Sequence, residues 1–509
     1  MSDNQAIMAE FGTMEELDCL LKEIHKPVMR LVLDLVVNHT SDENPWFEEA
    51  RKSRHNPYYN YYHWWPAEKG EPPLRLSYFD EEGNAWMYNK STDSYYLHYF
   101  SRKQPDLNWE NPEVRQEIFD MMRFWFDKGI DGFRMDSISL IAKDPSFPLI
   151  DSKKYPDIFS FYAKEPRLHL YLHEMNRQVL SKYDCMSVGE GSAVMVDDVA
   201  KFVDPAREEL NMLYHFDAAR IRNTTLPDNP ESGIDYSLIA LKKMFTEWDK
   251  AVDKGWPSIY LGNHDQPRMV SRFGSDKDEF RALSAKMLIT FLLTMRGTPY
   301  WFAGDEIGMR NIRFDRIEDY NDIDTINRYK KAKAEGKDPQ AVLDEQKETG
   351  RDNARTPFQW DRSPEAGFTA GTPWLKVNPD YTWINVADEE KDPTSILNYF
   401  KKVVSFRKEN PSLIYGSYHL LDAENPQSYT FLRKTGADTY LIMLNFSPKA
   451  AISTPGIDMS NAHVLLDNYG DRSHMAPQKD ITLRPFEAIV FQLNHPVYES
   501  FIDSLDLLE

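Results

Sequence analysis

The most constraining feature of the chain is the run LVLDLVVN at residues 31–38, which is almost continuously apolar and holds Asp34 as its single charge. Such runs are typical of strands that are buried on both faces of a parallel sheet. The segment before it carries a capping box at Thr13 and Glu16, followed by helical spacing of apolar residues from Met14 to Ile24. Because parallel strands need long crossover connections, this run predicts alternating helices and strands.

The same pattern recurs along the chain. The segment IDGFRMD at residues 130–136 follows a helix that we expect to begin at Asn111-Pro112 and to end at Gly129. Further expected strands are 185–190, 211–217, 257–265 and 298–304, and expected helices include 167–182 and 278–295. The alternation predicts an α/β fold of the (β/α)8 TIM-barrel class. Six strands are recognisable where such a barrel has about eight, so we expect an N-terminally truncated barrel, from a truncated gene product or a misassigned start.

Changes in composition divide the chain. We expect residues 1–415 to form the barrel, interrupted at 40–105 by a loop-rich inserted domain that is dense in Tyr, Trp, Pro and His. A second insertion, charged and then rich in Pro and Trp, is expected at 309–380. Residues 416–509 read as short strands separated by turn residues, which predicts a C-terminal antiparallel β-sandwich.

Charge and cysteine content exclude several classes of function. The net charge of −21 argues against a nucleic-acid partner and against anionic membrane surfaces. The only two cysteines, Cys19 and Cys185, are too far apart in sequence for a disulfide framework or a metal-binding spacing. No stretch has the length and apolarity of a transmembrane helix, and no signal peptide is visible. We therefore expect a cytoplasmic protein with a small-molecule partner, and the sequence leaves the oligomeric state open.

Polar side chains follow the expected strands where each strand ends. His39 follows the first strand, Arg134 and Asp136 alternate at the end of the second, and Glu190 ends the third. His264 and Asp265 end a later strand. Active sites of this fold class lie at the C-terminal ends of the strands, so three carboxylates from three strands are expected in one pocket.

Glycoside hydrolysis is the chemistry that suits this set. One carboxylate would attack the anomeric carbon, and a second, kept protonated, would give its proton to the leaving oxygen. Arg134 beside Asp136 would keep the pKa of that nucleophile low. The alternative for each motif alone is a salt-bridged strand end. A further alternative is calcium binding by Asp34, Asn38 and Asp106, whose oxygens could equally hold the inserted segment in place.

These motifs resemble a known family. DLVVNH, QPDLNW, GFRMD, VGE and NHD stand in the order found in the α-amylase superfamily, glycoside hydrolase family 13. The segments RDNARTPFQWD at 351–361 and LRPFEAIVFQL at 483–493 are similar to its oligo-1,6-glucosidase and α-glucosidase branch. The resemblance implies a retaining mechanism, with the two reacting carboxyl groups about 5–5.5 Å apart.

The resemblance also implies roles for individual residues. Asp136 would be the nucleophile, Glu190 the general acid/base, and Asp265 the residue that stabilises the distorted sugar. The residues expected to contact the innermost glucose are His39, Arg134, His264 and Arg351. No cofactor is implied as required; a structural calcium or magnesium ion stays an alternative, although the loop that often binds it in relatives is absent.

Two positions depart from the family pattern. Ser137 follows the nucleophile, where a Val tends to accompany α-1,6 linkages, so Ser137 favours α-1,4 or mixed use unless it is merely a small residue that fits. Asn4 stands where relatives have a sugar-contacting Tyr. The function expected is an exo-acting α-glucosidase acting on terminal α-1,4- or α-1,6-linked glucose of short oligosaccharides. The alternatives are a truncated, catalytically impaired member, a trehalose-6-phosphate hydrolase and a transglycosidase similar to sucrose isomerases.

Overall fold

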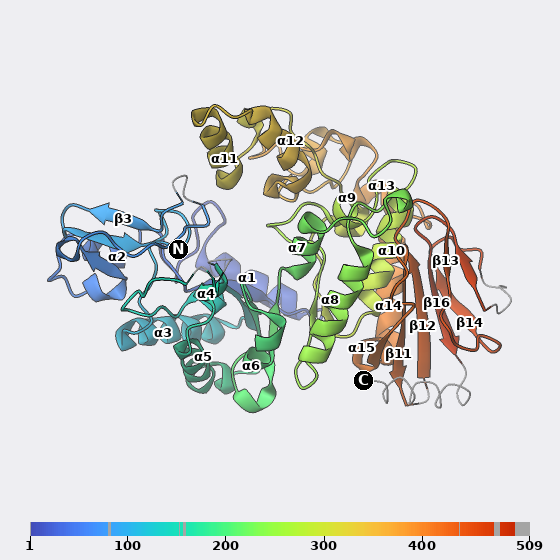
Figure 1. The fold of residues 1–509 in the computed structure, drawn as a ribbon, viewed down its shortest axis with the longest axis horizontal. Coiled ribbons are helices and arrows are strands. Elements are labelled where there is room, and N and C mark those ends of the chain that lie inside the picture. Colours follow the sequence, from blue (N-terminus) through green and yellow to red (C-terminus); the bar gives the residue numbers. More distant parts are fainter. Residues whose placement is uncertain are drawn as a thin grey trace. The chain divides into compact units, whose positions relative to one another are not determined.

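The fold was obtained as a computed structural model, which describes residues 2–79, 83–151, 153–155, 159–436, 438–472 and 479–493 (Figure 1). Contacts divide the chain into two compact units. The first contains Met1–Phe216 and Ala251–Trp256, and the second contains Asp217–Lys250 and Pro257–Glu509. The end of the expected C-terminal domain, residues 494–509, lies outside the described residues. The expected boundary at residue 416 is not a boundary between these units and stays a prediction.

The first unit holds a parallel sheet, an antiparallel insertion and their connecting helices. Its elements are α1 (Met14–His25), β1 (Val32–Val36), α2 (Pro45–Ala50), β2 (Trp64–Pro66), β3 (Trp86–Asn89), β4 (Ser94–Leu97), α3 (Pro112–Lys128), β5 (Gly132–Asp136), α4 (Phe159–Tyr162), α5 (Arg167–Gln178), β6 (Met186–Glu190), α6 (Ala200–Val203) and β7 (Met212–Tyr214).

The parallel sheet has the strand order β1-β5-β6-β7. Its strands run in register, with Asp34 opposite Arg134 and Val36 opposite Asp136. Because β1 is an edge strand among the described residues, its burial differs from the expectation that it is covered on both faces. Only Leu35 of β1 is buried, and Asp34 is exposed.

The helix signals in the sequence are confirmed. The Thr13 side chain accepts from the Glu16 amide and the Glu16 side chain accepts from the Thr13 amide, which is a complete capping box for α1. Asn111 caps α3 ahead of Pro112, and Gly129 ends that helix in the left-handed conformation that glycine adopts readily. Along the amphipathic helix α1, only Leu21 is buried.

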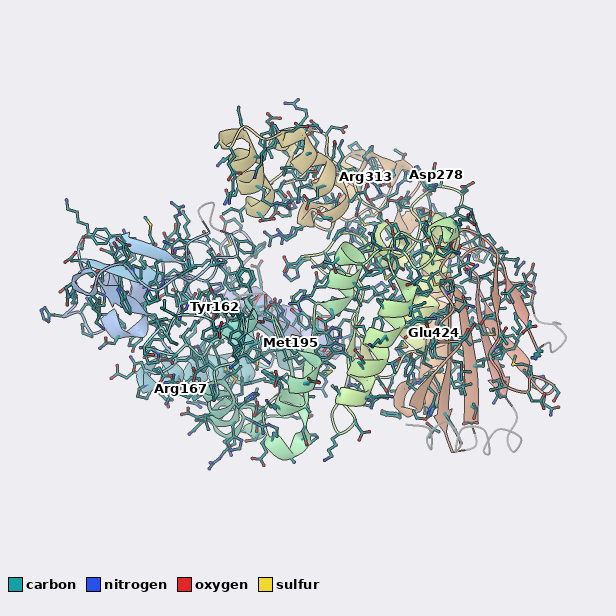
Figure 2. The ribbon with its side chains drawn as sticks, in the orientation of Figure 1. Tyr162, Arg167, Met195, Asp278, Arg313 and Glu424 are labelled. Atoms are coloured by element: carbon teal, nitrogen blue, oxygen red, sulfur yellow. The ribbon has the colours of Figure 1, made fainter. Side chains whose placement is uncertain are left out.

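The insertion after β1 contains a small antiparallel sheet with the order β2-β4-β3. Its many aromatic residues mainly form a core, as the composition indicated. The ring of Tyr162, which Figure 2 labels, stacks on that of Tyr99 with centroids 3.9 Å apart, and Phe147 meets Trp86 edge to face. Segments outside the insertion, including α4, thus contribute to its packing.

The second unit carries the remaining parallel strands and the C-terminal sheets. Its elements are α7 (Asp217–Thr224), α8 (Leu238–Ala251), β8 (Ser258–Ile259), α9 (Met269–Phe273), α10 (Arg281–Thr294), β9 (Thr298–Pro299), α11 (Ile323–Ala334), α12 (Pro339–Thr349), α13 (Val386–Glu389), α14 (Ile396–Glu409), α15 (Ser412–Tyr415), β10 (Ser417–Leu421), β11 (Ser428–Thr435), β12 (Asp438–Asn445), β13 (Ala451–Ser453), β14 (His463–Asp467), β15 (Ile481–Leu483) and β16 (Ala488–Leu493).

The six expected parallel strands are all present as β1, β5, β6, β7, β8 and β9, with β8 and β9 forming a parallel pair in the second unit. The expected C-terminal domain contains a five-stranded antiparallel sheet in the order β10-β11-β12-β16-β14 and a separate pair β13-β15. Side chains from both sheets share one apolar core, which is the arrangement of a β-sandwich.

The C-terminal sheet is joined to helices of the same unit by buried cations. Lys242 of α8 donates to the carbonyl oxygens of Asp422, Asn425 and Ser428, at 2.8–3.2 Å. Arg433 of β11 donates to the carbonyl oxygen of Thr294, the last residue of α10. These contacts explain why helices and C-terminal sheet form one unit.

The second insertion is a helical hairpin of α11 and α12 with its own small core around Phe314, Tyr320, Leu343 and Leu375. Arg313 (Figure 2) at the base of this insertion forms ion pairs with Glu348 of α12 at 2.7 Å and with Asp276 of a neighbouring segment at 2.7 Å. Over the described part of the chain, none of the helices combines the length and apolarity that crossing a membrane requires.

We expect Gly132→Ala to lower the melting temperature of the protein by several degrees. Gly132 lies in β5, and a methyl group there would press into the backbone carbonyl of Met186 in β6. Backbone atoms of a central sheet cannot rotate away, so we expect this overpacking to cost about 1–3 kcal/mol or more. Differential scanning calorimetry measures the shift. The matched control is Gly371→Ala, whose added methyl would find its nearest neighbour, Thr369 Oγ1, at 3.7 Å. Equal melting temperatures for both variants would contradict the expectation.

Candidate active site

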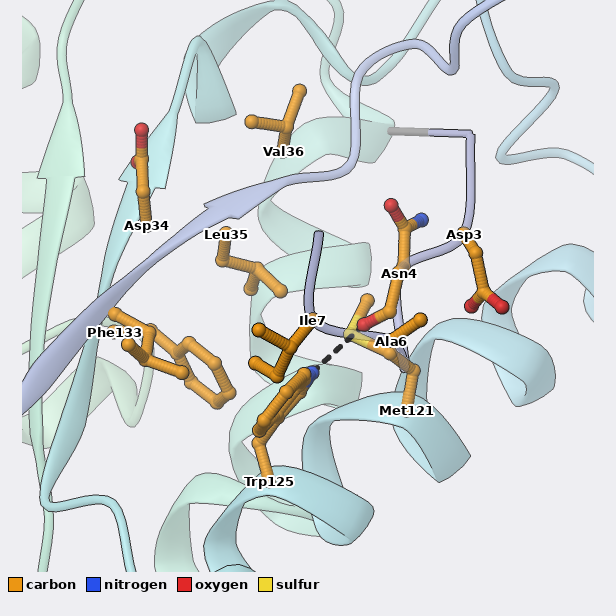
Figure 3. A pocket seen from close by; sticks show the side chains of 11 residues that line it. Asp3, Asn4, Ala6, Ile7, Asp34, Leu35, Val36, Met121, Trp125 and Phe133 are labelled. Atoms are coloured by element: carbon orange, nitrogen blue, oxygen red, sulfur yellow. Dashed lines mark hydrogen bonds between the residues drawn. The ribbon is translucent and has the colours of Figure 1, made fainter. Parts of the chain in front are cut away.

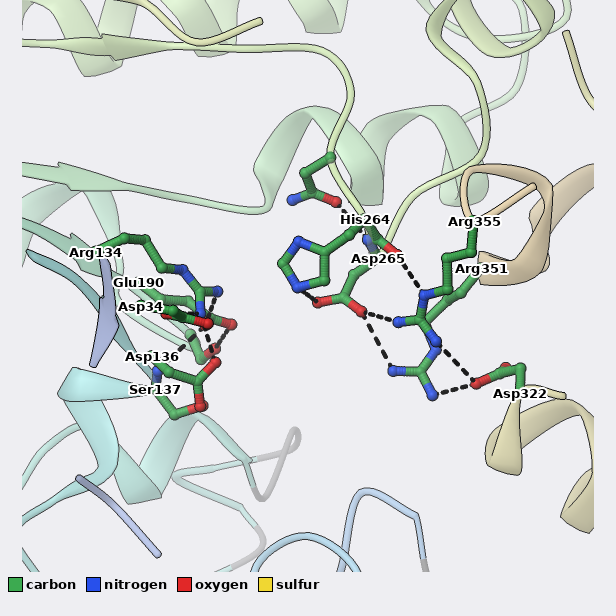
Figure 4. A network of polar contacts seen from close by, with 12 residues as sticks. Asp34, Arg134, Asp136, Ser137, Glu190, His264, Asp265, Asp322, Arg351 and Arg355 are labelled. Carbon is green, nitrogen blue, oxygen red and sulfur yellow. Dashed lines mark hydrogen bonds and ion pairs between the residues drawn. The ribbon is translucent and has the colours of Figure 1, made fainter. Parts of the chain in front are cut away.

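The parallel sheet of the first unit aligns the polar ends of its strands. Side chains of Arg134 and Asp136 point to the same face because they are two residues apart in β5. The register puts Asp34 of β1 opposite Arg134, and Glu190 of β6 opposite Tyr214 of β7. Four adjacent strands therefore each contribute one or two polar side chains to one cluster. Figure 4 shows Asp34, Arg134, Asp136 and Glu190 from three of these strands.

Arg134 is the centre of this cluster. Its Nη1 donates to Asp34 Oδ1 at 2.8 Å and to Asp136 Oδ1 at 2.7 Å, while its Nη2 donates to Glu190 Oε2 at 2.5 Å. The guanidinium Nε donates to the Tyr214 hydroxyl at 2.8 Å. One planar cation with several fixed donors thus holds three carboxyl groups in a defined geometry.

The two innermost carboxyl groups have pKa values that are shifted in opposite directions. Burial raises the pKa of Glu190 to about 8, helped by the negative charge of Asp136 and opposed by Arg134. Burial also acts to raise the pKa of Asp136, but the Arg134 charge, the nearby His39 and hydrogen bonds from Glu190 and Arg134 together outweigh it, so that the pKa of Asp136 is lowered. The two side chains share a hydrogen bond. At neutral pH Glu190 therefore carries a proton and donates it toward an ionised Asp136.

The separation of about 5–5.5 Å between the two carboxyl groups that a retaining pair would have stays a prediction. Arg134 holds the two carboxyl groups side by side, because its Nη1 donates to Asp136 as well as to Asp34, and its Nη2 donates to Glu190. Glu190 receives two more hydrogen bonds, from the Ser137 amide at 3.2 Å and from the Ser192 hydroxyl at 3.1 Å.

Ser137 acts on Glu190 through its backbone. It has a φ of 45°, in the left-handed region that residues other than glycine seldom adopt. This conformation points its amide at Glu190. The residue is only 2% exposed, so it presents its main chain to the cluster and keeps its side chain out of solvent. Its expected influence on linkage preference stays a prediction.

His39 is buried just beyond β1 and is held in one orientation. The Asn38 side-chain amide lies 3.2 Å from Nδ1, and the Gln104 amide nitrogen lies 3.0 Å from Nε2. Burial lowers the pKa of His39 to about 4, so the ring is neutral at physiological pH. A buried, neutral histidine of this kind can donate one hydrogen bond and accept another.

Lys143 lies beside His39, among the residues considered above as calcium ligands. Its Nζ donates to Asn38 Oδ1 at 2.6 Å and lies 3.1 Å from Asp106 Oδ2. The third residue of that alternative, Asp34, is bound instead by Arg134. Among the described residues, no three His, Cys, Asp or Glu side chains converge as metal ligands. The oxygens of Asn38 and Asp106 therefore face the ammonium group of Lys143 in place of a metal ion.

A pocket of about 260 Å³ borders the cluster at the exposed side of β1 (Figure 3). It is lined by Asp3, Asn4, Ala6, Ile7, Met121, Trp125, Phe133 and residues 33–36. The Trp125 indole donates to the Asn4 carbonyl oxygen at 2.8 Å, which fixes the N-terminal segment against α3. Asn4, expected at a sugar-contacting position, thus lines a pocket that also contains Asp34.

The second unit contains a separate polar network around Asp265 (Figure 4). Asp265 Oδ1 accepts from Arg355 at 2.6 Å and from Arg351 at 3.3 Å, and Oδ2 lies 3.2 Å from His264 Nε2. Arg351 also binds Asp322, which caps the N-terminus of α11. The network joins the loop after β8 to the second insertion.

The structure groups the expected site residues within each unit. One cluster, in the first unit, consists of Arg134, Asp136, Ser137 and Glu190, with His39 nearby. The other cluster, in the second unit, consists of His264, Asp265 and Arg351. The residues that sequence reasoning missed are Tyr214, Lys143, Arg355 and Asp322. Arg355 had a signal, because it lies one helical turn after Arg351 in the motif already singled out. Tyr214 and Lys143 had none, since each stands in an ordinary apolar stretch.

Comparison with known proteins gives a consistent result. The sequence model of the α-amylase catalytic domain matches residues 1–416. The chain is 48% identical to the oligo-1,6-glucosidase of Parageobacillus thermoglucosidasius, covering 97% of this chain and 89% of that protein. It is 45% identical to the oligo-1,6-glucosidase of Bacillus cereus, covering 97% and 88%.

Among solved structures, the trehalulose synthase from Pseudomonas mesoacidophila MX-45 superposes with a TM-score of 0.91 at 39% identity, covering 97% of this chain and 88% of that one. This likeness confirms the barrel class expected from the alternating strands and helices. Family match, sequence identity and fold agree over nearly the whole chain, and the chain belongs to the α-amylase family, glycoside hydrolase family 13.

Proposed function

We propose that the protein is a retaining, exo-acting α-glucosidase that hydrolyses terminal α-1,4- and α-1,6-linked glucose from short oligosaccharides. The observation that carries the proposal is the carboxyl pair held by Arg134, one member ionised and the other protonated at neutral pH. The oligo-1,6-glucosidases at 48% and 45% identity support the substrate class.

The pair fits a double displacement. Asp136 attacks the anomeric carbon while Glu190 gives its proton to the departing glycosidic oxygen, which leaves glucose covalently bound to Asp136. Glu190, now ionised, takes a proton from water, and the hydroxide releases glucose with the original anomeric configuration. An inverting enzyme needs room for a water, with its carboxyl groups about 6.5–9.5 Å apart. We expect Asp136 and Glu190, which bind the same Arg134 guanidinium, to lie closer together than that.

The remaining assignments rest on the family pattern. Asp265, held by Arg355 and Arg351, is proposed to stabilise the positive charge that develops on the sugar. His39, Arg134, His264 and Arg351 are proposed to orient the glucose. We propose that catalysis needs no divalent cation at Asn38 and Asp106, because Lys143 supplies the positive charge there.

A second candidate function is transfer of the bound glucose to another sugar instead of to water. The structural likeness to a trehalulose synthase, with a TM-score of 0.91, supports glucose transfer as this second candidate. Both reactions pass through the same covalent intermediate, so the carboxyl pair serves either. Product analysis with sucrose separates them: hydrolysis gives free glucose and fructose, and transfer gives an isomeric disaccharide.

We expect the purified protein to release p-nitrophenol from its α-glucoside, and Asp136→Asn to reduce kcat by at least about 10³-fold, since removal of a nucleophile costs this much or more. The matched control is Asp120→Asn, on the exposed face of α3, where the change affects a surface ion pair with Arg123 and hydrogen bonds from Gln116. Equal loss in both variants would point to misfolding, and retained activity in Asp136→Asn would contradict the assignment.

We expect maltose and isomaltose both to be cleaved, with glucose as the first product from longer chains. Anomeric proton NMR during the first minutes should show α-glucose ahead of its β-anomer. Initial release of β-glucose would contradict retention.

We expect kcat/KM to fall as the pH rises through about 8, where Glu190 loses the proton that it must donate. On the acid side, activity requires an ionised Asp136, whose lowered pKa places that limb at low pH. Arg134→Met removes the charge that lowers the pKa of Asp136, so the acid limb should move to higher pH. Tyr214→Phe removes the two hydrogen bonds that Arg134 Nε and Nη2 donate to the Tyr214 hydroxyl but keeps the Arg134 charge, and its acid limb should move much less. Equal acid limbs in wild type and Arg134→Met would contradict the role given to Arg134.

A further inference from the structure

The two carboxyl oxygens of Glu190 face different partners. Oε2 accepts from Arg134 Nη2 at 2.5 Å and from the Ser137 amide at 3.2 Å, and neither of these groups can accept a hydrogen bond. Oε1 lies 3.1 Å from the Ser192 hydroxyl, which can donate or accept. The proton that Glu190 carries at neutral pH therefore belongs on Oε1.

The backbone on both sides of the Ser192 hydroxyl is anchored. The Gly191 amide donates to the carbonyl oxygen of Tyr214 in β7 at 2.9 Å. The Ser139 hydroxyl donates to the Ser192 carbonyl oxygen at 2.7 Å. Gly191 approaches β7 so closely that an added methyl group would lie 2.5 Å from Leu213 Cδ2. Two neighbouring segments thus determine where Ser192 places its hydroxyl, just beyond the end of β6.

The Ser192 hydroxyl acts differently on the two protonation states of Glu190. While Oε1 carries its proton, the contact is a hydrogen bond between two neutral groups. Once the proton has left, Oε1 can only accept, so the Ser192 hydroxyl must donate to it. A hydrogen bond to an ionised carboxylate is roughly twice as strong as one between neutral groups. The hydroxyl therefore stabilises the ionised form of Glu190 more than the protonated form.

We propose that Ser192 is a positioning residue whose hydroxyl, together with the two donors at Oε2, keeps the transferable proton of Glu190 on Oε1 and stabilises that oxygen after the proton has left. The proposal rests on the proposed function to the extent that Glu190 is the general acid and base. In the first step the O–H bond at Oε1 breaks, and the proton goes to the glycosidic oxygen. In the second step Oε1 takes a proton from the attacking water, so the carboxyl group returns to its starting state.

The charges around Glu190 influence its pKa more strongly than one hydroxyl group does. Burial and the negative charge of Asp136 raise the pKa of Glu190, and the Arg134 charge lowers it. Ser192 is uncharged, so its replacement changes the hydrogen bonding at Oε1 and keeps all of these charges in place. The titratable groups that face Glu190, directly or through Arg134 and Asp136, are Asp34 of β1, His39, Arg134 and Asp136 of β5, and Tyr214 of β7.

The test compares Ser192→Ala, which lacks the hydroxyl, with Ser192→Thr, which keeps one. The matched control is Ser181→Ala, a change at an exposed serine whose hydroxyl donates to the Arg177 carbonyl oxygen at 3.4 Å. Carbon-13 NMR of protein labelled at the glutamate carboxyl groups reports the titration of Glu190, and its signal is assigned by its loss in Glu190→Gln. Circular dichroism shows which variants are folded, and Ser192→Gly takes the place of Ser192→Ala if the latter does not fold.

In Ser192→Ala we expect the titration midpoint of Glu190 to move to higher pH by about 0.5–1 pH unit, because the ionised form loses a hydrogen bond. The basic limb of kcat/KM for maltose should move with it, whereas Ser192→Thr and Ser181→Ala should titrate like the wild type.

A Glu190 midpoint that is unchanged in folded Ser192→Ala would overturn the proposal, whatever the kinetics. A midpoint that folded Ser192→Thr fails to restore would overturn it as well. If the wild type cleaves no α-glucoside, the proposed function fails, and the NMR titration still decides the role of Ser192.

Discussion

The arrangement of the cluster depends on the guanidinium of Arg134. It faces three carboxyl groups with a single positive charge, so the cluster cannot hold three negative charges in a partly buried site without a large cost. One of the three carboxyl groups therefore has to stay protonated, and burial determines which one. Exposed fractions of the side chains fall from 52% for Asp34 to 23% for Asp136 and 9% for Glu190. Glu190, the most buried, keeps the proton. The proposed roles of Glu190 as acid and Asp136 as nucleophile are consistent with this gradient of solvent access.

A lysine could not take the place of Arg134. The contacts run from Nε, Nη1 and Nη2 to four different side chains, and only a planar group with fixed donors reaches all of them at once. At Asn38 and Asp106 the requirement is different, because the two oxygens converge on one point. There a compact ammonium is sufficient, and Lys143 provides it. In the second unit, Arg433 and Lys242 bind backbone carbonyls instead of carboxylates. Each of these buried cations joins segments that are distant in the sequence.

The sequence was informative wherever function or fold leaves a local pattern. All six parallel strands could be predicted from apolar runs, and Asp136 and Glu190 from their place at strand ends. Burial of β1 was predicted wrongly, because an apolar run shows that a strand can be covered and does not show which neighbours cover it. Lys143 and Tyr214 were missed for a related reason. Their roles come from contacts over 105 and 80 positions of sequence, and neither residue type nor local spacing records such a contact.

Ser137 shows how a backbone requirement constrains a specificity position. The family pattern treats this side chain as a determinant of linkage, yet its amide supports Glu190 from a left-handed conformation. For a residue other than glycine that conformation costs about 1–2 kcal/mol, and a β-branched residue resists it more strongly. A change from Ser to Val at this position would therefore act on the backbone that holds the general acid as well as on the shape of the pocket. The predicted influence of Ser137 on linkage and its support of the proposed general acid would then be coupled through one residue, and serine is compatible with both because it is small and unbranched at Cβ.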